Sequence, residues 1–116
     1  MSNQTIVTKQ IMISALQDQR PGFVGQYIGK ALVAIFERQT KSEQSANITN
    51  DANNIGFAGC DAKSGSISAK YFLKNKKLED WMIQNWTRDY KGSPRITKYH
   101  RQLNEIALEK QRLRVK

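Results

Sequence analysis

Apolar side chains recur at spacings of three and four residues along much of the chain, which is the repeat of one face of an α-helix. The clearest stripe runs from Tyr27 to Gln39 and predicts a helix over about residues 24–44. A weaker stripe predicts a short helix over about residues 7–17, although its isoleucines would also suit a strand. The Pro-Gly pair at 21–22 separates the two segments, because proline and glycine both interrupt helices.

Three further helices are predicted in the second half of the chain. The first of them should end near Asn75. The next carries Trp81 and Trp86, which we place close to one helical face and therefore expect in the core. The last should begin at Ser93 and Pro94, because serine caps helices and proline suits the first helical position.

These elements predict an all-α protein, a small single-domain bundle of about five helices with one long Asn/Gly-rich structured loop. A chain of 116 residues has the length of one domain. Within the domain at 1–116, we expect residues 1–22 to hold a loosely attached N-terminal helix and residues 110–116 to form a basic tail.

The predicted loop spans about residues 45–61 and is rich in Asn, Gly and Ser, which make local turns. Gly56 and Gly59 would permit tight backbone turns. Phe57 would anchor the loop in the core, and Asp61 would cap the helix that follows. The alternative to this structural clasp is a loop that contacts a ligand directly.

Positive charge is concentrated near the end of the chain. The net charge of the chain is +9. Residues 91–116 hold eight basic and two acidic side chains, whereas residues 1–90 hold eleven basic and eight acidic side chains. Such a surplus favours contact with a polyanion without choosing between DNA, RNA and an acidic protein surface. The alternative is a solvated helix face with a basic tail that has no ligand.

The basic residues of the last predicted helix fall at helical spacing beside its apolar stripe, so they could follow a phosphate backbone. Tyr90 lies at a helix end next to Lys91 and is the best candidate for stacking on an unpaired base. We expect one continuous, water-facing strip. The predicted nucleic-acid-binding residues are Lys74, Lys76, Lys77, Arg88, Tyr90, Lys91, Arg95, Lys98 and Arg101.

Catalytic and metal-binding patterns are sparse. His100 is the single histidine, which excludes a two-histidine metal site. Cys60 is the single cysteine, which excludes an internal disulfide and a cysteine-rich zinc site and suits a reducing cytoplasm. We therefore predict a protein that is not an enzyme and has no metal or cofactor. No apolar run approaches the ~20 residues of a membrane-spanning helix, so a membrane partner is not expected.

The order of several short motifs resembles a pattern in small, mostly uncharacterised phage and plasmid proteins. In that family an N-G-x-G-F-x-x-x-D loop precedes a short helix, and a final helix carries K-Y-x-x-Q-L. This chain reads N-N-I-G-F-A-G-C-D at 53–61 and K-Y-H-R-Q-L at 98–103. The same module looks like segments attached to helicase-like, DNA-handling proteins of mobile elements. The resemblance covers about residues 38–107 and implies a mobile-element origin in a bacterial cytoplasm, a nucleic-acid setting and no catalytic residue.

Two functions follow as hypotheses. The first is a non-catalytic phage or plasmid accessory protein that binds DNA or RNA through the basic face. The second is a phage-encoded inhibitor that binds a host protein or a ribonucleoprotein complex of the defence or transcription machinery. Salt-sensitive binding to bare nucleic acid would favour the first hypothesis over the second.

Overall fold

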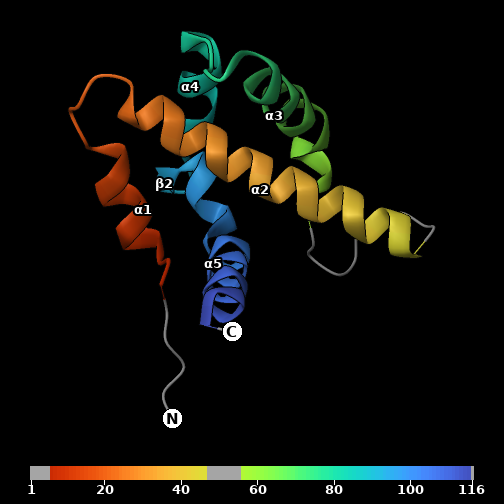
Figure 1. The fold of residues 1–116 in the computed structure, drawn as a ribbon. Coiled ribbons are helices and arrows are strands. Elements are labelled where there is room, and N and C mark those ends of the chain that lie inside the picture. The colour runs from red at the N-terminus through yellow and green to blue at the C-terminus, as the bar shows by residue number, and fades with distance from the viewer. Residues whose placement is uncertain (1–5, 47–55, 116) are drawn as a thin grey trace.

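A long central helix organises the fold, and the other elements pack along it (Figure 1). The computed structural model describes residues 6–46 and 56–115, with side chains described outside 40–46 and 113–115. The described residues form a mostly helical single domain. Its elements are α1 (Lys9–Leu16), α2 (Phe23–Ala46), η2 (Gly59–Asp61), α3 (Ala62–Asn75), α4 (Asp80–Thr87), β1 (Asp89–Tyr90), β2 (Ser93–Pro94), η3 (Arg95–Tyr99) and α5 (His100–Val115), where η denotes a 3-10 helix.

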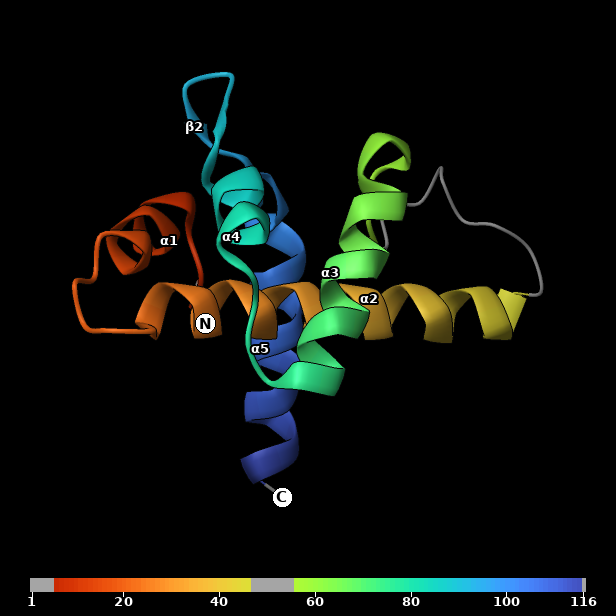
Figure 2. The same ribbon diagram turned by 90° about the horizontal axis from the view of Figure 1, so that it is seen from above.

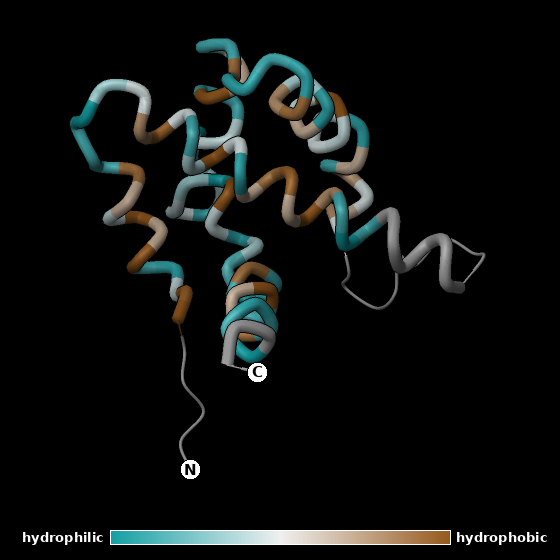
Figure 3. The backbone as a smooth tube through the Cα atoms, in the orientation of Figure 1, coloured by the Kyte–Doolittle hydropathy of each residue, from teal (hydrophilic) through white to brown (hydrophobic). Residues whose placement is uncertain are grey.

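The core forms where α2 and α3 cross. In Figure 3 apolar positions recur along α2 between hydrophilic ones, as the sequence pattern predicts. Ile28, Leu32 and Ile35 of α2 are fully buried. Gly29 lets the two helices approach, because a Cβ atom there would lie 2.2 Å from the ring of Phe72 on α3. Each fully buried side chain of this size contributes about 1.5–3 kcal/mol, so the burial of α2 stabilises the fold.

The N-terminal segment is tied to the far end of the chain. The side chain of Met12 on α1 is fully buried in the common core. The backbone N–H groups of Ile6 and Val7 donate hydrogen bonds to Oδ1 of Asn104 on α5, at 2.6 and 2.8 Å. The segment that we expected to be loosely attached is therefore held by both apolar packing and hydrogen bonds.

A short hairpin, with two residues in each strand, occupies the positions where we predicted the start of the last helix. Ser93 and Pro94 pair antiparallel with β1, so the prediction that they begin a helix is wrong. The turn residues Lys91 and Gly92 have φ values of 54° and 92°, and this pair of positive φ values is that of a type I′ hairpin turn. The turn draws Ser93 and Pro94 into extended backbone, and α5 begins only at His100, after η3.

The two tryptophans of α4 lie on different sides of that helix. Trp86 is fully buried, whereas Trp81 is 56% exposed, so the prediction of a core Trp81 is wrong. Five residues correspond to about 140° of rotation around a helix, so the two rings cannot share one face. Met82 shares the buried face with Trp86, as expected for residues four apart.

The other helix predictions agree with the structure to within two or three residues, apart from the start of the last helix. Residues 47–55 of the predicted loop, including the first three motif positions at 53–55, lie outside the described residues. Residues 110–115, expected as a tail, continue α5, and residue 116 is not described. Among the described residues we find no helix with both the length and the apolar content that crossing a bilayer requires.

Candidate functional site

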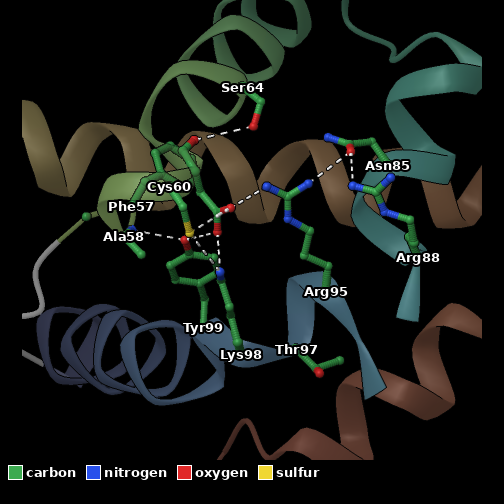
Figure 4. A network of polar contacts seen from close by, with 12 residues as sticks. Phe57, Ala58, Cys60, Ser64, Asn85, Arg88, Arg95, Thr97, Lys98 and Tyr99 are labelled. Atoms are coloured by element: carbon green, nitrogen blue, oxygen red, sulfur yellow. Dashed lines mark hydrogen bonds and ion pairs between the residues drawn. The ribbon is translucent and has the colours of Figure 1, made fainter. Parts of the chain in front are cut away.

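A buried carboxylate joins the start of α3 to η3 (Figure 4). The side chain of Asp61 is fully buried and forms ion pairs with Arg95 and Lys98, the latter with 2.6 Å between Nζ and Oδ2. The hydroxyl of Tyr99 donates to the same Oδ2 at 2.5 Å. A buried charge requires partners of this kind, because its desolvation costs several kcal/mol.

The carboxylate of Asp61 does not cap α3, although we predicted that role from the sequence. Asp61 occupies the cap position, but its side chain makes no hydrogen bond to the first amides of the helix. It turns instead toward η3, where charge-assisted bonds to two cations stabilise it more than neutral amides would. The predicted cap is therefore wrong, and the side chain serves as a link between two segments.

The pKa of Asp61 reflects this environment. Burial by itself raises the pKa of the carboxyl, but the hydrogen bonds from Lys98, Tyr99 and Arg95 outweigh burial and hold the pKa below its ordinary value. Burial, and next the hydrogen bond to Asp61, raise the pKa of the Tyr99 phenol well above its usual range. The phenol therefore stays protonated and remains a donor to Asp61, while its oxygen accepts the N–H of Ala58 at 3.0 Å.

Arg95 extends the link to α4. Its Nη1 donates to Oδ1 of Asn85 at 2.9 Å, while Nη2 faces Asp61. The guanidinium carbon lies 4.7 Å from the ring centroid of Trp86, whose indole N–H donates to Ser68 on α3. A planar guanidinium can meet a carboxylate, an amide and an aromatic face at once, which a lysine ammonium cannot do.

The described part of the long loop is fastened to α2 and α5. The side-chain amide of Gln102 donates to the carbonyl of Gly56 and accepts from its N–H, both at 2.8 Å. The N–H of Phe57 donates to Oε1 of Gln39 at 2.9 Å. Gly56 has φ of 87°, and a Cβ atom there would lie 2.4 Å from Gln39, so this position requires glycine.

Phe57 is buried, and its ring meets those of Tyr99 and Trp86 at centroid distances of 5.7 and 6.0 Å. A Cβ atom at Gly65 would lie 2.6 Å from the Phe57 ring, so α3 leaves room for it. Gly59, by contrast, has no positive φ and nothing within 4 Å of an added Cβ. The chain does turn tightly there, because the N–H of Asp61 donates to the carbonyl of Ala58 at 2.9 Å in the 3-10 helix, but this turn does not require glycine.

An open cleft of about 520 Å³ lies beside this network, between the loop, the hairpin and the start of α5. Tyr90, 39% exposed, stands at its edge, and the Nζ atom of Lys98 lies 4.6 Å from the ring centroid. The Lys98 side chain is 18% exposed. The lining residues are Gly56, Phe57, Ala58, Gly59, Cys60, Tyr90, Lys98, Tyr99, Arg101 and Gln102.

Three of the nine predicted binding residues line this cleft, and two more lie on or beside the hairpin that carries one of them. We define the cleft face as these five residues: Arg88, Tyr90, Lys91, Lys98 and Arg101. The ammonium group of Lys91 lies 5.4 Å from the centroid of the Tyr90 ring. Arg95, the sixth residue nearby, is engaged with Asp61 and Asn85 and is mostly buried.

The remaining three predicted residues lie elsewhere. The distal lysines, defined as Lys74, Lys76 and Lys77, are exposed at the end of α3 and in the following turn, at the opposite end of that helix from η2 and the hairpin (Figure 2). Lys76 borders a separate hollow of about 230 Å³ together with Lys30 and Lys110. The continuous strip that we expected is therefore divided into two regions, and Asp61 neutralises part of one of them.

Several residues of the network were missed in the sequence, and two of them had a position that could have identified them. Gln39 and Asn85 both fall on the apolar stripes of their helices, where a polar side chain needs a buried partner. A polar residue on an apolar stripe was therefore the feature of the sequence that could have revealed them. It identifies them as candidates for an internal hydrogen bond, but it does not identify the loop amide or the arginine that they contact.

Neither a protein-family model, nor a curated protein, nor a solved structure matches this chain. The resemblance to phage and plasmid proteins therefore stays a prediction that depends on the motifs. In the fold, the two motifs contact each other, because Asp61 binds Lys98 and Tyr99 and the backbone of Gly56 binds Gln102.

Proposed function

We propose that this protein is a non-catalytic nucleic-acid-binding protein and that the cleft face is its contact surface. One observation carries the proposal: an exposed aromatic ring, Tyr90, borders a cleft that is also lined by the cationic groups of Lys98 and Arg101. Cations that bind phosphate, beside an aromatic ring that can stack on a base, form the combination that nucleic-acid-binding surfaces use.

The charge of this surface supports the proposal. Arg88, Lys91 and Arg101 are exposed, and Asp89 is the acid beside them on the hairpin. The buried cluster adds a positive charge, because Asp61 is one carboxylate between two cations, Arg95 and Lys98. The local charge is about +3, from three exposed cations, one exposed acid and the single positive charge of the buried cluster. This charge attracts a polyanion.

The motifs that resemble mobile-element proteins also support the proposal. Their residues supply the whole lining of the cleft except Tyr90, and also Asp61 behind it, so the shared pattern coincides with the proposed contact surface. On this interpretation the protein is a phage or plasmid accessory protein that works in the cytoplasm of a bacterial host.

The direct test is a titration of the purified protein with labelled single-stranded DNA, duplex DNA and RNA between about 50 and 200 mM salt. With three or four phosphate contacts, the logarithm of the affinity should fall with the logarithm of the salt concentration with a slope of about −2 to −3. This slope is shallower than a strip containing all the predicted cations would give. The absence of binding to all three ligands at the lowest salt would contradict the proposal.

A second candidate function is supported by Trp81. This side chain is 56% exposed on α4, and exposed tryptophans are often central to protein–protein interfaces. It would suit a phage-encoded inhibitor that binds a host protein or a ribonucleoprotein complex. Failure to bind nucleic acid, together with capture of one host protein that Trp81→Ala abolishes, would favour this candidate.

A further inference from the structure

We infer that the cleft receives one unpaired nucleotide, so that the protein prefers single strands to duplexes. The inference rests on the proposed function and makes it more specific. In the bound state the base would stack at Tyr90, and a neighbouring phosphate would contact Lys98 and Arg101. Three observations carry it: the shape of the cleft, the position of Tyr90 and the way in which Lys98 is held.

The volume of the cleft is that of a site for a small molecule or a single nucleotide. Its volume of about 520 Å³ falls within the ~300–1,000 Å³ of pockets that hold small molecules. A duplex keeps its bases stacked and paired inside, and its grooves are read by a helix or a strand that projects into them. The three binding residues that line the cleft, Tyr90, Lys98 and Arg101, face a concave surface, which can enclose a base that has left the stack.

Tyr90 is placed for stacking by the hairpin. Its backbone pairs with Ser93 across the type I′ turn, so the side chain is held at the edge of the cleft. Lys98 and Lys91 hold ammonium groups over the ring, 4.6 and 5.4 Å from its centroid, so a base that stacks there takes the place of one of them. An aromatic ring with adjacent cations matches a nucleotide, in which a flat base lies one sugar away from a phosphate.

Lys98 is a cation that the fold has already positioned. Its ammonium group lies 2.6 Å from Oδ2 of Asp61 and 3.9 Å from Sγ of Cys60. An ammonium group has three donors, so a further donor remains for a ligand in the cleft. Asp61 shares one negative charge between Lys98 and Arg95, so the three groups together keep one positive charge beside the cleft. Arg101 lines the same cleft from α5 and is exposed, which gives the phosphate a second contact.

The test compares Tyr90→Ala and Tyr90→Phe with the wild type on three labelled ligands of about 15 nucleotides. The ligands are a single strand, the same strand with abasic sites in place of its bases, and the matching duplex. We expect Tyr90→Ala to weaken binding to the single strand by about 5- to 100-fold, because it removes one base-stacking contact. Tyr90→Phe keeps the ring and should stay within about twofold of the wild type. Neither variant should change binding to the duplex or to the abasic strand.

The outcomes separate this inference from the proposed function. Preference for the single strand, lost in Tyr90→Ala and kept in Tyr90→Phe, supports the inference. Equal binding of single strand and duplex, unchanged in both variants, overturns the inference and leaves the proposed function in place. Absence of binding to every ligand overturns both. Tyr90 is exposed, so both variants should keep the thermal unfolding midpoint of the wild type, which shows that any lost affinity is local.

Discussion

The cleft face and the distal lysines are two basic regions of one small domain, and they differ in organisation rather than in charge. The distal lysines are exposed side chains that form no ion pair with a described residue. At the cleft face, Lys98 is positioned by a buried carboxylate and lies against an aromatic ring. A count of lysines and arginines along the chain cannot separate the two regions, whereas the placement of one acid, Asp61, does.

The largest expected effect comes from removing that acid. Asp61→Asn leaves Arg95 and Lys98 without their counter-ion, and breaking a buried ion pair from one side costs about 3–5 kcal/mol. Urea denaturation should show this loss in the free energy of unfolding. The matched control is Glu109→Gln on the exposed part of α5, which should change stability by no more than about 0.5 kcal/mol. Equal effects of the two substitutions would contradict the role given to Asp61.

The pH dependence of stability gives a smaller and more specific effect. Because the pKa of Asp61 is lower in the folded state than in the unfolded chain, its contribution is complete above the unfolded value of about 4 and is lost as the pH falls toward the native value. In that range the free energy of unfolding of the wild type should fall by up to about 1.4 kcal/mol more per pH unit than that of Asp61→Asn.

Unfolding curves at a series of pH values between about 6 and 3 measure this difference. Glu109→Gln again serves as the control, because its carboxylate is exposed and should leave the slope of the wild type unchanged. Parallel curves for the wild type and Asp61→Asn would show that Asp61 titrates alike in the folded and unfolded states, and that the network does not hold it.

Residues whose partners are near in sequence were predictable, and those whose partners are distant were not. The apolar stripe of α2 and the end of α3 near Asn75 follow from local spacing and agree with the structure. The partners of Asp61 lie 34 to 38 residues further along the chain, and only the packed fold brings them together. A short polar side chain before a helix is a common cap, so the local pattern favoured the wrong partner.

The hairpin is another feature that we did not predict from the sequence. Lys91 in the left-handed region is uncommon for a residue other than glycine, asparagine or aspartate. Without one of those residues at position 91, the sequence predicts that Tyr90 lies at a helix end rather than beside a type I′ turn. That turn places Tyr90 at the cleft, so the aromatic candidate was identified from the sequence while its surroundings were not.

The central claim is that the cations of the cleft face, rather than total charge, bind nucleic acid. Two triple variants that remove the same number of charges test it most directly. Arg88→Ala, Lys91→Ala and Arg101→Ala together empty the cleft face of its exposed cations, and alanine at all three distal lysines is the matched control. All six side chains are exposed, so both variants should remain folded.

The measurement is the salt dependence of binding to a labelled single strand, compared for the wild type and the two triple variants. We predict that the cleft-face variant loses most of the slope, a change of about 2, because it removes three cations and each phosphate contact contributes about 0.7. The distal variant should change the slope by less than about 1. Equal flattening in both variants would show that net charge alone drives binding and would contradict the claim.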